Sequence, residues 1–373
     1  MRLVSLLFLT ATPTLAATPE EVTTHYADMA LATYQDSLTT AQALQTAVQA
    51  LIATPSDATL QAARDAWKAA RVPYQQSEAF RFGNPIVDDW EGRVNSWPLD
   101  EGLIDYVSAD YGNEENALAT LNVIATPKFT LSGTEIDAST ITPDLISGTL
   151  HEADGVEANV ASGYHAIEFM LWGQDLNGTN PGAGNRPATD FATGDACTNG
   201  NCDRRAAYLQ SATDLLVADL TEMVDNWDAD GPARAAVTAD PQKGILAILT
   251  GMGSLSYGEL AGERIKLGLM LNDPEEEQDC FSDNTHNSHF YDGVGIRNVY
   301  LGTYTRTDGS TLQGPALSEL VAAADPAVDS QLKTELDASV AALQAMKDAG
   351  DTGKTFDTLI APGNAEGEAI IMA

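Results

Sequence analysis

Apolar residues recur at helical spacing along most of this 373-residue chain. The longest amphipathic pattern covers residues 20–54, and the next begins at Ser56, a residue type that commonly caps a helix N-terminus. Pro73 lies inside this second pattern, where it is expected to kink the helix and to free backbone groups near Glu78.

Strand patterns are few, so we expect an all-α fold. Further helical patterns occupy residues 114–125, 143–171 with an interruption near Gly155, 205–227, 241–271 and 315–349. Residues 173–204 are rich in Gly, Asn, Thr and Pro and have no helical period, which is typical of a long irregular loop. This composition predicts two helical-bundle domains, residues 17–172 and 205–373, joined by that loop.

The first residues have the pattern of a Sec-type signal peptide. Arg2 is followed by an apolar run from Leu3 to Leu9 and then by small residues, so we expect residues 1–16 to be removed near Ala16–Ala17. The apolar run is too short to span a bilayer, no later segment is long enough, and no cysteine marks a lipoprotein site. These features predict a periplasmic or secreted protein without a transmembrane segment after cleavage.

The formal net charge of −35 argues against nucleic acid and anionic membranes as partners. A negative field raises the local concentration of cations, so the charge is compatible with metal binding. A salt-adapted, solvated surface explains most of the negative charge equally well.

The chain has three cysteines, and two of them lie close together in the predicted loop. In an oxidising compartment Cys197 and Cys202 are expected to form a local disulfide. A zinc site is a weaker alternative because the loop contains no histidine. Cys280 is then left over, although its pairing with one of the other two cysteines stays open.

The segment "GYHAIE" places His165 and Glu168 three residues apart. On a helix these positions share one face, so an imidazole and a carboxylate there can hold one metal ion or exchange a proton. The alternative is a hydrogen-bonded pair without a metal. Gly163 precedes them at a propensity cost of about 1 kcal/mol, which suggests a close backbone approach or a ligand.

A complete metal site needs ligands from elsewhere, and five residues are candidates on chemical grounds. Carboxylates near an imidazole suit iron, with zinc and calcium as alternatives. "PLDEG" also fits a helix N-terminus and "FSDNTHN" also fits a polar surface loop. The candidates are Glu78, Asp100, Glu101, Asp283 and His286.

The chain lacks the G-x-S-x-G, P-loop, dinucleotide-binding and H-E-x-x-H patterns. By contrast, "GYHAIE" matches the G-x-H-x-x-E motif of the imelysin family at Gly163, His165 and Glu168. The segments "DAWKAARVPYQQSEAFRFG", "WPLDEGLIDYV", "GERI" and "CFSDNTH" are similar to other recurring segments of that family. The sequence thus resembles imelysins over nearly the whole mature chain, and its nearest subgroup is the iron-regulated imelysin-like proteins.

The resemblance implies an exported bacterial protein of two helical bundles that is linked to iron uptake, with His165 and Glu168 as its metal ligands. We therefore expect a periplasmic protein that binds iron, as an ion or in a small metal-containing ligand, and that acts with iron-transport components of the cell envelope. The family was first described as metallopeptidases, so a peptidase is one alternative. A ligand-binding protein without metal is the other.

Overall fold

The structure is a computed structural model that describes residues 17–111 and 116–373. The predicted signal peptide, residues 1–16, lies outside the described residues. Helices dominate the described part, and its strands are confined to two short antiparallel hairpins. The prediction of an all-α fold is therefore confirmed.

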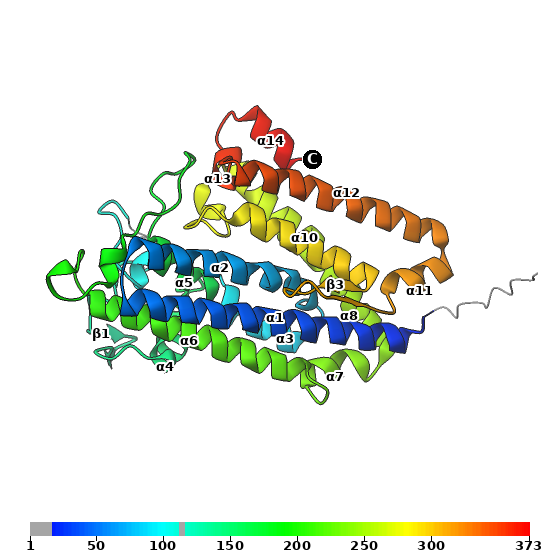
Figure 1. The fold of residues 1–373 in the computed structure, drawn as a ribbon, viewed down its shortest axis with the longest axis horizontal. Helices are drawn as coiled ribbons and strands as arrows, with labels where there is room; N and C mark the ends of the chain where they lie inside the picture. Colours follow the sequence, from blue (N-terminus) through cyan, green and yellow to red (C-terminus); the bar gives the residue numbers. More distant parts are fainter. Residues whose placement is uncertain (1–16, 112–115) are drawn as a thin grey trace, which may run out of the picture.

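Six long α-helices build the body of the described part of the molecule (Figure 1), and a π-helical stretch, Ser254–Leu267, continues the fourth of them. They are α1 (Pro19–Ala53), α2 (Asp57–Ser77), α6 (Cys202–Trp227), α8 (Pro241–Gly253), α10 (Thr285–Leu301) and α12 (Pro326–Asp351). The shorter helices are α3 (Pro85–Asn95), α4 (Pro143–Leu145), α5 (Gly163–Trp172), α7 (Pro232–Thr238), α9 (Gly268–Leu271), α11 (Leu317–Ala324), α13 (Phe356–Leu359) and α14 (Ala365–Ile371). The hairpins are β1 (Lys128–Leu131) with β2 (Thr134–Asp137) and β3 (Thr303–Thr305) with β4 (Thr311–Gln313).

The first two helices begin where their capping residues predict. Thr18 and Glu21 form a reciprocal capping box at the start of α1, and Ser56 and Thr59 do the same for α2. Helix α2 runs through Pro73 to Ser77, whose hydroxyl donates to the carbonyl oxygen of Tyr74. The Ser77 hydroxyl therefore satisfies the backbone carbonyl of the residue that follows Pro73.

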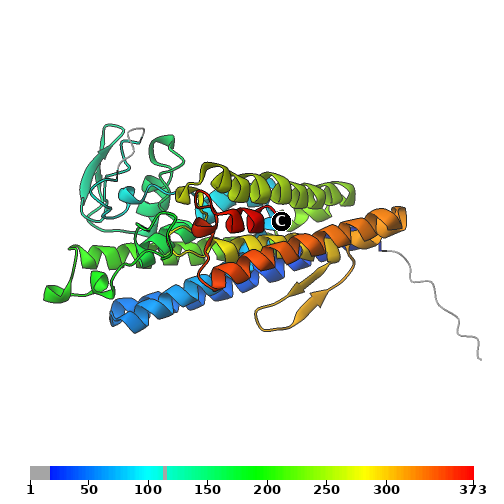
Figure 2. The same cartoon turned by 90° about the horizontal axis from the view of Figure 1, so that it is seen from above.

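The long helices pack side by side in an order that differs from their order along the chain. Helix α1 packs against both α2 and α6, α2 contacts α10, and α10 contacts α12 (Figures 1 and 2). Helix α6 thus lies beside the first helix of the chain, although it follows the 173–204 loop. The division into domains at that loop stays a prediction.

One large hydrophobic cluster runs through these helices and includes the fully buried Trp67 and Trp227. A second, smaller cluster joins α12 to α13 through Met346, Phe356 and Leu359. It holds the C-terminal end of the chain against the rest of the molecule. No helix of the described ranges is long and apolar enough to cross a membrane.

The predicted helix over residues 114–125 is wrong for its described part, because residues 116–125 form turns. The backbone amides of Asn122, Val123 and Ile124 donate to the carbonyl oxygens of residues 102–104. This long-range pairing replaces the local helical hydrogen bonds that the apolar spacing suggests. The interruption expected near Gly155 is present, and the chain returns to α-helix only at Gly163.

Candidate metal centre

Helix α5 begins with a glycine that no other residue can replace without strain. Gly163 has φ +80°, and an added Cβ would overlap the backbone carbonyl of Val94 at the end of α3. Trp67 of α2 donates its indole N–H to the carbonyl oxygen of Tyr164 over 2.9 Å. The first turn of α5 is therefore fixed from two sides, and this turn carries His165.

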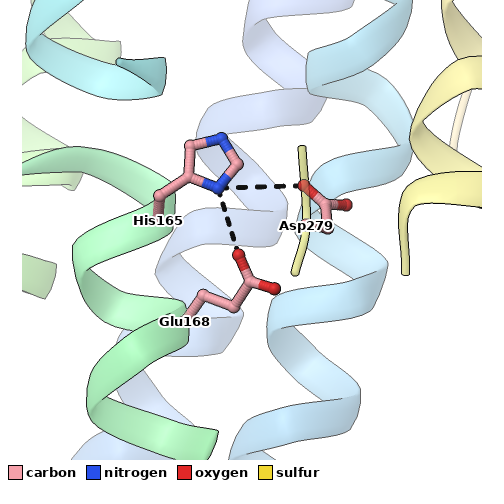
Figure 3. A group of neighbouring side chains, drawn as sticks. All are labelled: His165, Glu168 and Asp279. Carbon is pink, nitrogen blue, oxygen red and sulfur yellow. Dashed lines mark hydrogen bonds and ion pairs between the residues drawn. The ribbon is translucent and has the colours of Figure 1, made fainter. Parts of the chain in front are cut away.

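His165, Glu168 and Asp279 point toward one another in the protein interior (Figure 3). His165 Nδ1 lies 3.1 Å from Glu168 Oε2 and 3.8 Å from Asp279 Oδ1. All three residues are buried, with at most 1% of each exposed. His165 and Glu168 share one face of α5, while Asp279 comes from the segment that precedes α10.

Each carboxylate is anchored by one oxygen and presents the other to the histidine. Glu168 Oε1 accepts a 3.0 Å hydrogen bond from the amide of Ser282. Asp279 Oδ2 accepts from the Asn284 side-chain amide at 2.9 Å and from the Ser288 hydroxyl. Outer hydrogen bonds of this kind orient the ligands in protein metal sites.

A buried arginine adjoins the cluster. Arg71 of α2 donates to Asp279 Oδ1 at 2.9 Å and to Asn95 Oδ1 at 2.6 Å. Its guanidinium also lies 5.1 Å from the ring centre of Tyr164. Arg71 therefore balances the charge of Asp279, and a metal ion at this place would have to share that oxygen with it.

The three groups titrate far from their ordinary ranges. Burial, helped by the positive charge of Arg71, lowers the pKa of His165 to about 3. Burial and then the charge of Asp279 raise the pKa of Glu168 well above its usual value. Burial would also raise the pKa of Asp279, but Arg71 holds it below its ordinary value. These shifts favour a neutral imidazole and an ionised Asp279, and they make Glu168 a weaker acid than an exposed glutamate.

These residues fit a metal ion. Ligand atoms about 2.1 Å from one ion lie about 3 to 4 Å apart, which is the separation found between His165 Nδ1 and the two carboxylate oxygens. One nitrogen and two oxygens form a donor set that iron, zinc or manganese accepts. A bound metal would replace the hydrogen bond between His165 Nδ1 and Glu168 Oε2.

The sequence matches a family model described as Imelysin over residues 30–373. The chain belongs to the imelysin family. The resemblance inferred from the G-x-H-x-x-E motif is thus confirmed, and the motif supplies two of the three residues that converge in the structure.

Individual relatives agree with this membership. Iron-regulated protein A from Synechococcus elongatus is 44% identical over 63 residues, which span 17% of this chain and 17% of that relative. The crystal structure of an iron-regulated protein A precursor from Parabacteroides distasonis has a TM-score of 0.65 at 22% identity over 97% of both chains. An imelysin-like protein from Psychrobacter arcticum has a TM-score of 0.61 at 16% identity over 98% of this chain and 93% of that one. At these identities the two structures show a shared fold.

The sequence did not single out Asp279. It lies in "QDCFSDNTHN", four residues before the predicted ligand Asp283. Its contact with His165 depends on how this segment folds back over α5. The one signal in the sequence is that an acidic residue precedes a run of Ser, Asn and Thr able to anchor it.

The structure does not bring the other predicted ligands to His165. Glu78 Oε2 instead accepts a 2.9 Å hydrogen bond from Arg264, which also bonds Asp292 at 3.0 Å. The charge of Arg264 holds the pKa of Glu78 below its ordinary value although burial would raise it. Glu78 is thus part of a buried ion-pair network.

Asp100 and Glu101 occupy the start of a short 3-10 turn. Asp100 accepts hydrogen bonds from the Tyr111 hydroxyl at 3.0 Å and from the Asn116 side-chain amide. Glu101 lies 3.5 Å from the Gln174 side-chain amide, and burial raises its pKa. Both carboxylates therefore link neighbouring loop segments through hydrogen bonds.

Asp283 and His286 point to different neighbours. Asp283 lies with Asp175 and Asp357 in a separate acidic cluster. His286 packs against Gly350 of α12, and its Nε2 lies 3.5 Å from Asp351. Cys197 and Cys202 form a disulfide at the start of α6, and Cys280 is free.

Proposed function

We propose that this chain is an exported metal-binding protein that holds an iron ion at His165, Glu168 and Asp279 and serves iron acquisition in the periplasm. The observation that carries the proposal is the convergence of one imidazole nitrogen and two carboxylate oxygens, each carboxylate anchored through its other oxygen. The relatives named iron-regulated protein A support iron as the metal. The signal-like first residues support export.

The charge of the centre suits a cation with two or more positive charges. With Glu168 ionised, the two carboxylates together outweigh the single charge of Arg71. Three protein ligands also leave coordination positions for a small ligand that arrives with the metal. This arrangement favours capture of iron as an ion or as a small complex.

The sequence is compatible with two other functions. A metallopeptidase needs a polypeptide to reach the metal and usually a separate base. Here the three side chains are buried and Glu168 is itself a ligand, so the geometry disfavours that reaction. A metal-free binding protein is favoured by one observation, the 2.9 Å Arg71–Asp279 ion pair, which neutralises Asp279 without a metal.

The deciding experiment is a metal titration. Chelator-stripped mature protein is titrated by calorimetry with Fe²⁺ under anaerobic conditions, with Fe³⁺–citrate, and with Zn²⁺ and Ca²⁺. We expect one iron per chain. The isosteric Glu168→Gln and Asp279→Asn variants should weaken binding by more than the roughly 10- to 100-fold that loss of an outer partner costs.

Matched controls come from the predicted ligands that lie elsewhere. Glu101→Gln and His286→Gln should bind iron as the wild type does. Equal binding by the wild type, Glu168→Gln and Asp279→Asn would refute the site. A stripped protein that takes up no metal would favour the metal-free function, and iron-dependent cleavage of an unfolded protein that Glu168→Gln abolishes would favour the peptidase.

A further inference from the structure

A second group of carboxylates lies apart from His165. Asp175, Asp283 and Asp357 each offer a ligand oxygen, and these oxygens lie within 4.8 Å of one another. They come from three segments: the loop after α5, the residue just before the α10 cap, and the short helix α13. The cluster therefore joins the C-terminal end of the chain to the 173–204 loop.

Several buried acids of the described ranges pair with an arginine, whereas these three aspartates do not. Within residues 17–111 and 116–373, Asp279 pairs with Arg71, Asp105 with Arg205, and Asp292 with Arg264. None of the three clustered aspartates forms an ion pair with a Lys, Arg or His of these same ranges; every ion pair found there joins other residues. Buried charges without a partner are costly, so the arrangement calls for a compensating cation.

Hydrogen bonds do not replace the missing cation. Asp357 is fully buried, and neither of its oxygens has a hydrogen-bond partner of good geometry among the described residues, although the nearby Thr355 hydroxyl and Thr358 amide lower its pKa in part. Asp283 is 8% exposed, and its Oδ1 also lacks a donor there. Asp175 accepts from the backbone and side-chain amides of Asn177 through one oxygen, Oδ1. Several carboxylate oxygens that face one another are thus left without donors.

We propose that Asp175, Asp283 and Asp357 bind a hard divalent cation of the Ca²⁺ type, at a site separate from the His165 centre. A set of carboxylate oxygens without nitrogen or sulfur is the ligand chemistry that Ca²⁺ prefers, and its flexible coordination tolerates ligands from three segments. Burial, and then the negative charges of Asp357 and Asp175, raise the pKa of Asp283 to about 7. The charged Lys68 lowers that pKa only in part.

The site has a structural consequence. Asp283 follows Asp279 on the same segment, and Asp357 belongs to α13, which packs on α12 through Phe356. A bound Ca²⁺ would therefore tie α13 to the segment that carries a ligand of the His165 centre. Heat stability should increase with Ca²⁺ as binding to the folded state predicts.

The test uses the mature, chelator-stripped protein, with Ca²⁺ as the probe in calorimetry and thermal unfolding. We expect one Ca²⁺ per chain and a saturable rise in Tm. Asp357→Asn and Asp175→Asn should each weaken Ca²⁺ binding at least tenfold. Asp175 is only half-buried, so its variant should fold even if Asp357→Asn does not.

Two controls separate this site from its surroundings. Asp195→Asn changes an exposed aspartate of the same loop and should leave Ca²⁺ binding unchanged. Glu168→Gln should also leave Ca²⁺ binding unchanged. A variant that loses iron binding but retains Ca²⁺ binding would show that the two sites are independent. The proposal is overturned if the wild type binds none of Ca²⁺, Mg²⁺ and Mn²⁺ saturably, or if both cluster variants bind like the wild type.

Discussion

Arg71 donates a hydrogen bond to the same Asp279 oxygen that faces His165. A guanidinium and a metal ion would compete for that oxygen and repel each other. The repulsion of two charges about 4 Å apart in a partly screened interior is on the order of 4 kcal/mol. Arg71 is therefore expected to restrain metal affinity while it stabilises the metal-free protein.

Arg71→Met should bind divalent iron at least about tenfold more tightly than the wild type because the competing charge is gone. Without metal, the variant should lose about 3 to 5 kcal/mol of unfolding free energy, since Asp279 stays buried without its partner. Calorimetry and urea unfolding with and without metal measure both effects. Arg71→Lys keeps the charge and should show a smaller gain in affinity; weaker binding by Arg71→Met would show that Arg71 instead aligns Asp279.

Gly163→Ala should destabilise the protein by at least about 2 kcal/mol, because the residue has φ +80° and the new methyl group overlaps the Val94 carbonyl. Gly253→Ala is the matched control. Gly253 ends α8 with helical φ −70°, and an added Cβ would meet open space. That variant should gain about 0.5 to 1 kcal/mol. Similar urea midpoints for the two variants would contradict the role assigned to Gly163.

Structural features that depend on residues close together in the chain could be predicted from the sequence. The caps at Ser56 and the loss of helix near Gly155 follow from local patterns, and the shared face of His165 and Glu168 follows from their spacing on one helix. The family resemblance rested on such local motifs as well, and it extended the prediction to the whole fold.

Long-range partners could not be predicted from these patterns. The amide that anchors Glu168 comes from Ser282, 114 positions further along, and the arginine that pairs with Glu78 is 186 positions away. Residues 116–125 have helical spacing but pair with residues 102–104. In each case the tertiary contacts determine the role of the residue. From the sequence alone, a carboxylate such as Glu78 is as suitable for binding a metal as for pairing with an arginine.

The disulfide is expected to stabilise the start of α6 without affecting the metal centre. Cys197 and Cys202 close a short loop with a sequence separation of 5, for which chain entropy predicts about 2 kcal/mol. The double variant Cys197→Ser/Cys202→Ser should lose about that much unfolding free energy. Its iron affinity should match the wild type, because His165, Glu168 and Asp279 lie on other segments. A loss of iron binding in the folded variant would contradict this independence.

His286 should make the protein less stable in mild acid. Burial lowers its pKa to about 4, although Asp351 raises it in part. An unfolded chain binds that proton near pH 6.5, so between about pH 6.5 and 4 the unfolded state takes up a proton that the folded state refuses. The contribution of His286 to the free energy of unfolding is therefore fully present above pH 6.5. It decreases by up to about 1.4 kcal/mol for each unit by which the pH is lowered below that value.

The comparison of wild type with His286→Gln isolates this contribution, because other titrating groups are common to both. In chelator, the unfolding free energy of the wild type minus that of the variant should decrease by about 3 kcal/mol from pH 7 to pH 4. Asp351→Asn removes the carboxylate 3.5 Å from Nε2, so it should lower the pKa of His286 further and extend the decrease to lower pH. A difference that stays flat from pH 7 to pH 4 would show that His286 takes up its proton in the folded state, with Asp351 stabilising the imidazolium.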